Sequence, residues 1–126
     1  MSWQSFVDEH LVGTGTVTSA AIVGLDGNIW AASAGFTVKK DEADKIVAAF
    51  KDPSGVQAGG FYANGQKYMF LSKTDNALYG KKASTGICAQ KTNGCVIIAF
   101  YDDKIQGGQC NVTVGKLADY FREVGY

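Results

Sequence analysis

The stretches MSWQSFVDEHLV (residues 1–12) and NVTVGKLADYFREVGY (residues 111–126) decide the fold. Each predicts a short amphipathic helix, because its apolar residues recur every three or four positions. The residues predicted to face the core are Trp3, Val7 and Leu11 in the first stretch and Val114, Leu117, Phe121 and Val124 in the last. Both stretches carry more rings than one buried stripe needs. We therefore expect terminal helices that leave aromatic rings at the surface.

These surplus rings suggest a binding groove. Phe6 and His10 form a second stripe in the first helix, and Tyr120 lies off the core stripe of the last one. If the two helices pack side by side on a sheet, their rings form one apolar groove. Such a groove suits a proline-rich segment, which already holds its polyproline II conformation and loses little chain entropy on binding. Alternatively, Trp3 and Trp30 are ordinary core residues, and the residues alone leave both interpretations open.

The segment between the termini predicts strands and a single helix. After a Gly-rich turn at 13–16, a strand runs to about Gly24 and returns through residues 29–32. Asp41 is the expected N-cap of a helix that ends at about Phe50, before the stop signal Asp52–Gly55. From Gly59 to Tyr101 we expect an antiparallel meander. Its turns are predicted at residues 64–65, 74–76, 83–85 and 92–94.

Several of these strands are apolar on both faces. In residues 66–73, for example, Tyr68 and Phe70 alternate with Met69 and Leu71. An antiparallel sheet with two dry faces needs cover on both sides. Three helices are available for this. We therefore predict one α/β domain over residues 1–126, a three-layer sandwich with the terminal helices on one face of a central antiparallel sheet and the remaining helix on the other.

The composition excludes several classes of function. Twelve basic and twelve acidic residues cancel, so no overall field attracts nucleic acid. We find no leader and no apolar run of membrane-spanning length, and the three cysteines, Cys88, Cys95 and Cys110, are odd in number. Buried free thiols in a cytosolic protein are the expectation. The only histidine is His10, and adjacent carboxylates such as Asp102–Asp103 are typical of a solvated turn. We therefore expect no enzyme, no cofactor and no metal site.

A family resemblance runs through the whole chain. The opening SWQSFVD resembles that of the profilins, small actin-monomer-binding proteins, and in particular the short profilins of amoeboid protists. Further matching blocks are AAIVGLDGNIWA (20–31), GQKY (65–68), YGKK (79–82), KTN (91–93), IQGG (105–108) and KLADY (116–120). The family usually has Tyr where this chain has Phe6, so a hydroxyl that could bond a ligand carbonyl is absent.

The resemblance implies two binding surfaces. It assigns proline-rich ligands, such as formins and related assembly factors, to Trp3, Phe6, Trp30, Tyr120 and Tyr126. It assigns monomeric actin to Lys67, Phe70, Ser72, Lys81, Lys82, Ile105, Gln106, Gly107, Gly108, Asn111, Val112 and Lys116. Without the resemblance, the second set reads as a hairpin tip, a Gly-Gly turn and a solvated helix start. The implied function is regulation of actin polymerisation and actin nucleotide exchange at the cytoskeleton and cell cortex.

A weaker implied partner is a phosphoinositide membrane surface. The cations that would contact it are Lys81, Lys82, Lys91, Lys116 and Arg122. Each basic residue near a charged membrane contributes about 1 kcal/mol, so contact would be reversible and salt-sensitive. The alternative, to which we give equal weight, is that these five cations only make the surface soluble. A small-molecule sensor or trafficking scaffold of similar architecture is the alternative to the profilin interpretation as a whole.

Overall fold

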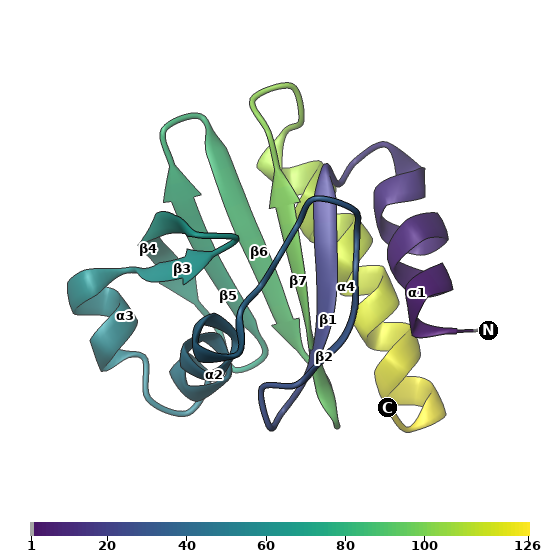
Figure 1. The fold of residues 1–126 in the computed structure, drawn as a ribbon, viewed down its shortest axis with the longest axis horizontal. Coiled ribbons are helices and arrows are strands. Elements are labelled where there is room, and N and C mark those ends of the chain that lie inside the picture. The colour runs from purple at the N-terminus through teal and green to yellow at the C-terminus, as the bar shows by residue number, and fades with distance from the viewer. Residues whose placement is uncertain (1) are drawn as a thin grey trace.

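The chain forms a seven-stranded antiparallel sheet with helices on both faces (Figure 1). The computed structural model describes residues 2–126. Its elements are α1 (Trp3–Ser5), η1 (Phe6–Leu11), η2 (Val12–Thr14), β1 (Ser19–Gly24), β2 (Ile29–Ala32), α2 (Lys40–Ala49), α3 (Ser54–Gly59), β3 (Phe61–Ala63), β4 (Gln66–Lys73), β5 (Ala77–Lys82), β6 (Thr85–Lys91), β7 (Cys95–Tyr101) and α4 (Gly107–Val124). The strand order is β2-β1-β7-β6-β5-β4-β3. The terminal helices cover one face and α2 and α3 the other, so the predicted three-layer sandwich is confirmed (Figure 1).

The N-terminal helical segment is continuous but irregular. α1 is α-helical, η1 is π-helical and η2 is a 3₁₀ turn capped by Gly15, which takes the left-handed conformation at a φ of 80°. The Val12 N–H bonds to the carbonyls of both Asp8 and Val7, which is the wider reach of a π turn. A π turn changes which side chains share a face. Phe6 is therefore buried together with Val7 and Leu11, although α-helical spacing placed it on a second stripe.

α4 is longer than its sequence pattern suggested. It starts at Gly107, so the expected Gly-Gly turn is the first turn of the helix. Cys110, Val114, Leu117 and Phe121 face the sheet as a buried stripe. Val124, which we expected in the core, is 47% exposed because it lies in the last turn, beyond the sheet.

The pairing of β1 with β7 joins the two ends of the chain. The register runs from Ser19 opposite Phe100 to Gly24 opposite Cys95. This long-range pairing places the helical segment before β1 beside the helix that follows β7. The predicted adjacency of the terminal helices is therefore confirmed, and Figure 1 shows them side by side.

The predicted N-cap of α2 was wrong, and a short helix after α2 was missed. The N-cap of α2 is Lys39 and not Asp41, because Glu42 makes the capping contact: its carboxylate accepts hydrogen bonds from the N–H of Lys39 at 2.9 Å and of Gly65 at 3.0 Å. α2 ends at Ala49, close to the predicted end at Phe50, but Ser54–Gly59 form a further short helix, α3, that we did not predict.

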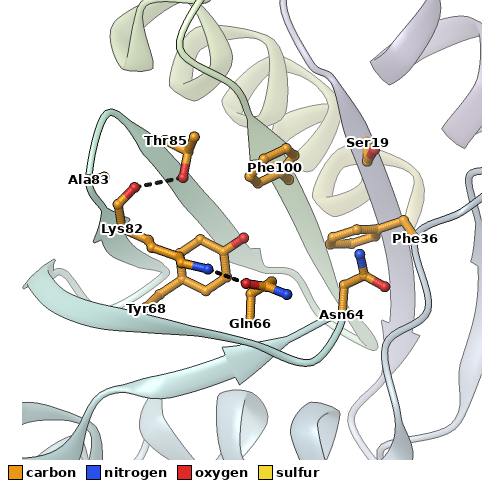
Figure 2. A pocket seen from close by; sticks show the side chains of 9 residues that line it. All are labelled: Ser19, Phe36, Asn64, Gln66, Tyr68, Lys82, Ala83, Thr85 and Phe100. Atoms are coloured by element: carbon orange, nitrogen blue, oxygen red, sulfur yellow. Dashed lines mark hydrogen bonds between the residues drawn. The ribbon is translucent and has the colours of Figure 1, made fainter.

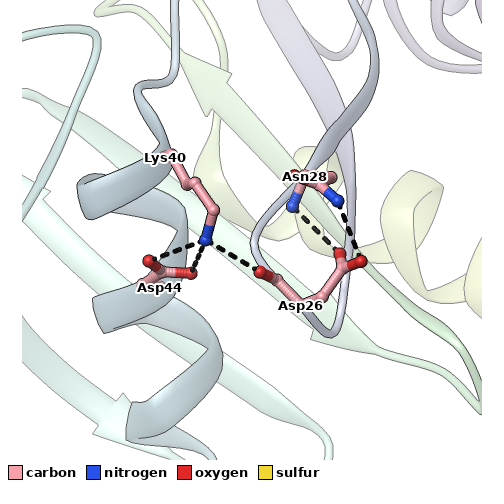
Figure 3. A network of polar contacts seen from close by, with 4 residues as sticks. All are labelled: Asp26, Asn28, Lys40 and Asp44. Carbon is pink, nitrogen blue, oxygen red and sulfur yellow. Dashed lines mark hydrogen bonds and ion pairs between the residues drawn. The ribbon is translucent and has the colours of Figure 1, made fainter.

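The β1–β2 turn is fixed against α2 (Figure 3). The Lys40 ammonium donates to the carbonyl of Asp26 at 3.1 Å and pairs with the Asp44 carboxylate at 3.2 Å. Asp26 also accepts from the main chain and the amide of Asn28. Gly27 has a φ of 85°, and an added Cβ there would collide with the Asp44 carboxylate. This turn holds β2, and with it Trp30, in place.

One strand face lacks the cover that we predicted. α4 crosses β6 and β7, and does not reach β4. Met69 and Leu71 of β4 are consequently 65% and 58% exposed. The inference of two dry faces therefore fails at β4. Within residues 2–126, no helix is long and apolar enough to cross a membrane.

Candidate functional site

Five rings gather where the terminal helices meet β2. We call Trp3, Phe6, Trp30, Tyr120 and Tyr126 the terminal aromatic surface. The Trp3 ring lies at its centre, with centroid distances of 4.7 Å to Trp30, 4.9 Å to Tyr126 and 5.9 Å to Phe6. Phe6 in turn lies 6.1 Å from Tyr120. Rings from three separate parts of the sequence thus form one continuous cluster.

Most of this cluster is open to solvent. Trp30 is 38% exposed, Tyr120 47% and Tyr126 46%, and Trp3 is half-buried. Within residues 2–126, neither indole N–H and neither phenol hydroxyl of these four residues makes a hydrogen bond. Apolar ring faces with free donors at their edges can stack on a ligand and donate to its carbonyl oxygens.

Phe6 has a different place from the one expected. It is 7% exposed, and its ring meets Phe121 edge-on at 4.9 Å. The π turn of η1 directs it inward, so it supports the other rings from below.

Three supporting contacts were not visible in the sequence pattern. The Gln4 side-chain amide donates to the carbonyl of Ala32 at 2.8 Å and so ties α1 to β2. Gly24 leaves room for the indole of Trp30, since an added Cβ would lie 2.9 Å from its Nε1. The main-chain oxygen of Tyr126 accepts from the Thr92 hydroxyl at 3.0 Å and from the Gly94 N–H. The first and third contacts join residues 28 and 34 positions apart, and periodicity cannot reveal any of the three.

A second surface lies beside α4, on the part of the sheet that the helix leaves bare. Strand register places Met69 beside Lys81 and Ser72 beside Tyr79, and Tyr79 packs against the core beneath α4. On α4, the stripe at Gly108 and Asn111 continues to Gly115, whose added Cβ would lie 3.5 Å from the Gln90 amide on β6. We call Met69, Ser72, Tyr79, Lys81, Gly108 and Asn111 the open sheet face. Met69 was not among the residues assigned from the sequence, because we expected it on a dry face of the sheet.

The structure divides the residues that we assigned to actin. Adjacent strand residues point to opposite faces of the sheet, so Lys81 and Lys82 lie on different faces. The Lys82 ammonium donates to the Gln66 side chain on the α2 side (Figure 2). Phe70 packs against the core on the α2 side and does not join the open sheet face. Lys116 lines a hollow with His10 and Tyr120, on the flank of α4 that faces the N-terminal helix.

The remaining assigned residues surround the open sheet face. Lys67 and Gln106 are exposed, Val112 is 57% exposed, and Ile105 packs against the core beneath α4. Gly107 lies against Tyr101, where an added Cβ would come 2.9 Å from the phenol oxygen. The Asn111 Oδ1 is buried with no partner in residues 2–126. An unpartnered buried acceptor of this kind costs free energy, so a partner that brings a donor to it would be favoured once the side chain turns outward.

The five cations assigned to phosphoinositide do not form one patch. Lys81 and Lys82 lie at one end of β5–β6 and on opposite faces, while Lys91 ends β6 at the other end. The Arg122 guanidinium is occupied, since it bonds to Asp119 at 2.9 Å, to Gln90 at 3.1 Å and to the carbonyl of Lys91 at 2.7 Å.

The three cysteines lie in the core beneath α4. All are buried and free, as the sequence predicted. Burial raises the pKa of all three thiols, that of Cys110 to about 12, so they stay protonated at neutral pH. Residues 2–126 contain no group of three side chains suited to hold a metal.

Comparison with known proteins identifies the family. The profilin family model matches residues 1–126. Profilin-A of Physarum polycephalum is 49% identical over the whole of both chains, and profilin-1B of Acanthamoeba castellanii 45% over the whole of both. The crystal structure of Acanthamoeba castellanii profilin II superposes with a TM-score of 0.98 at 45% identity, over 99% of this chain and 100% of the other. Mouse profilin IIa, solved in complex with a double repeat from the FH1 domain of mDia1, shares the fold with a TM-score of 0.83 at 23% identity, over 100% of both chains. The chain belongs to the profilin family.

Proposed function

We propose that this protein binds actin monomers and proline-rich segments through separate surfaces and so regulates actin polymerisation. Family membership supports this pair of partners. The alternative of a small-molecule sensor or trafficking scaffold would leave the exposed terminal rings without a role. Cortical and cytoskeletal location follows from the proposed partners, as does the delivery of monomers to formin-like assembly factors.

The observation that carries the proline-rich assignment is the geometry around Trp3. Its ring lies between Trp30 and Tyr126, with centroids 4.7 and 4.9 Å away. A polyproline II helix presents ring edges to stack on and carbonyl oxygens without intrachain donors. The free indole N–H and phenol O–H groups supply those donors. A rigid, pre-formed cluster also limits the entropy lost on binding.

Replacing Trp3 with Ala tests this proposal directly. We expect the variant to fold and its affinity for a decaproline peptide to fall at least tenfold, which is about 1.4 kcal/mol. Isothermal titration calorimetry measures the affinity, and circular dichroism the fold. Tyr62→Ala is the matched control, because Tyr62 is an exposed ring, 44% accessible, on β3 at the far edge of the sheet. Equal decaproline affinity of folded Trp3→Ala and wild type would reject the assignment.

For actin we propose the open sheet face with its surroundings, Lys67, Ile105, Gln106, Gly107 and Val112. Lys116, which lies beside Tyr120 on the flank of α4 that faces the N-terminal helix, is not part of this surface. Exposed Met69 and Val112 supply apolar contacts, Lys81 supplies a cation, and glycines at the start of α4 permit close backbone approach. An apolar centre with a polar rim is typical of protein interfaces. Because this surface and the terminal aromatic surface share no residue, both partners can bind together. A ternary complex of the protein, monomeric actin and decaproline should form in analytical ultracentrifugation, whereas competition would contradict this arrangement.

Faster nucleotide exchange on actin is the proposed consequence of that contact. It is measured by the release of a fluorescent nucleotide from monomeric actin with and without this protein.

Phosphoinositide binding is a further proposal, supported by the exposed lysines at the β5–β6 turn. With the cations dispersed, we expect only weak binding to phosphoinositide vesicles that disappears as salt is raised. No binding at low salt would remove that proposal.

A further inference from the structure

A hollow of about 330 Å³ lies on the α2 side of the sheet, away from both surfaces described above (Figure 2). Its apolar walls are Phe36, Tyr68 and Phe100. The rings of Phe36 and Phe100 are nearly parallel, with an interplanar angle of 24° and centroids 6.4 Å apart. Tyr68 meets Phe100 edge-on at 6.4 Å. This volume is near the lower end of the range for ligand pockets, and with three aromatic walls the hollow suits a ligand with one small ring.

Tyr68 brings a polar group to the floor of this hollow. Tyr68 as a whole is only 2% exposed, but its hydroxyl oxygen, which makes no hydrogen bond to any residue in 2–126, is not itself fully buried and opens onto the hollow. Figure 2 shows the hydroxyl pointing toward the space between Lys82 and Phe100. Burial raises the pKa of Tyr68 to about 12, so the hydroxyl keeps its proton at neutral pH. At the floor of the hollow this hydroxyl can donate to an occupant that supplies an acceptor.

The rim of the hollow offers donors and a single positive charge. The Lys82 ammonium reaches across to the side-chain oxygen of Gln66 (Figure 2). Asn64 uses its side-chain oxygen to accept from the Thr37 N–H at 2.9 Å, which leaves its amide N–H groups free. None of the residues that line the hollow carries a carboxylate. One cation among neutral donors matches a monoanion better than a doubly charged phosphate.

We propose that this hollow binds a small aromatic carboxylate. The ring of the ligand lies against Phe36 and Phe100, and its carboxylate accepts hydrogen bonds from the Tyr68 hydroxyl and the Lys82 ammonium. Lys82 exchanges its exposed contact with Gln66 for this charge-assisted bond. Because the hollow shares no residue with the terminal aromatic surface or the open sheet face, binding here does not depend on either proposed partner.

The test uses 3-phenylpropionate as the probe and follows backbone amide shifts by NMR at neutral pH. We expect saturable shifts around Asn64, Tyr68 and Phe100, with a dissociation constant in the millimolar range for so small a ligand. Acetate, which lacks the ring, and 3-phenylpropan-1-ol, which lacks the charge, should each bind more weakly. The absence of saturable shifts at these residues, or equal binding of the alcohol, would overturn the proposal.

Two variants assign the contacts. Lys82→Gln and Tyr68→Phe keep the shape of the pocket and should each weaken 3-phenylpropionate about threefold to tenfold. Lys81→Gln is the matched control, because Lys81 is the preceding residue of β5 and points to the opposite face. Lys81→Gln should leave the affinity unchanged. Wild-type affinity in either Lys82→Gln or Tyr68→Phe, or an equal loss in Lys81→Gln, would contradict the assigned geometry.

Discussion

The terminal aromatic surface and the open sheet face expose apolar groups in opposite ways. In the first, rings from α1, β2 and the end of the chain are held open by a buried ring, Phe121, which Trp3 and Tyr126 meet edge-on at 5.5 and 6.0 Å. In the second, Met69 is exposed simply because α4 does not extend over β4. The first surface therefore depends on packing among the two terminal segments and β2, whereas the second depends on the β4–β5 register and on where α4 ends. The two surfaces should respond differently to the same damage.

Phe121→Ala should have the largest effect and separate the two surfaces. Phe121 is fully buried beneath Trp3, Phe6 and Tyr126. Its removal should lower the free energy of unfolding by about 3–5 kcal/mol, as measured by urea denaturation. In the folded fraction, decaproline affinity should fall more than actin affinity. A stability loss below about 1 kcal/mol would mean that the cluster repacks freely.

Alkaline pH should weaken the core that both surfaces share. The pKa of Cys110 rises from 9.0 to about 12 on folding, so the protonated thiol is favoured in the folded protein. Its stabilising contribution is complete below pH 9.0 and is lost as pH rises toward about 12. The urea midpoint should thus decline over this range. Cys110→Ala should show a shallower decline than wild type, although Tyr68 still titrates, and an identical slope would contradict this account.

Met69→Glu should act on the open sheet face alone. A charge at an exposed apolar contact should weaken actin binding about tenfold or more and leave decaproline affinity and stability nearly unchanged. Binding is measured by calorimetry with monomeric actin. Leu25→Glu is the control, since Leu25 is 38% exposed in the β1–β2 turn, outside both surfaces. If both variants lose the same actin affinity, Met69 has no specific role.

Gln4→Ala should have the smallest effect and act on the terminal aromatic surface. It removes the 2.8 Å hydrogen bond to the Ala32 carbonyl, which should cost about 1 kcal/mol of stability. Because Trp3 is then held less firmly beside Trp30, decaproline affinity should fall a few-fold while actin binding stays constant. Gln57→Ala, an exposed glutamine on α3 and outside both surfaces, should change neither affinity. An unaltered decaproline affinity in Gln4→Ala would show that this bond does not position the surface.

Much of the fold followed from local pattern. Helical spacing located the terminal helices, and turn residues such as Asn64-Gly65 located the hairpins of the meander. The errors came where a contact from elsewhere decided the outcome. Glu42 replaced Asp41 as the capping side chain because its second oxygen also binds Gly65, on a turn 23 positions away. α3 was missed because its Asp-Pro-Ser-Gly opening reads as a stop signal for α2.

The site was harder to predict than the fold. The resemblance supplied the residues, but not which of them share a face. Period-2 alternation along β5 separates Lys81 from Lys82, and the π turn of η1 buries Phe6, which α-helical spacing placed at the surface. Both outcomes depend on local geometry that residue identity alone does not specify.

By itself the sequence determined that one amphipathic helix precedes and another follows an antiparallel meander, because periodicity and turn chemistry are encoded within a few neighbouring residues. Only the tertiary structure decided that β1 pairs with β7, that Trp3 meets Trp30 and Tyr126, and that α4 stops short of β4. These arrangements join residues far apart in the chain. They are set by how helices of given length cover a sheet of given width, which no local pattern contains.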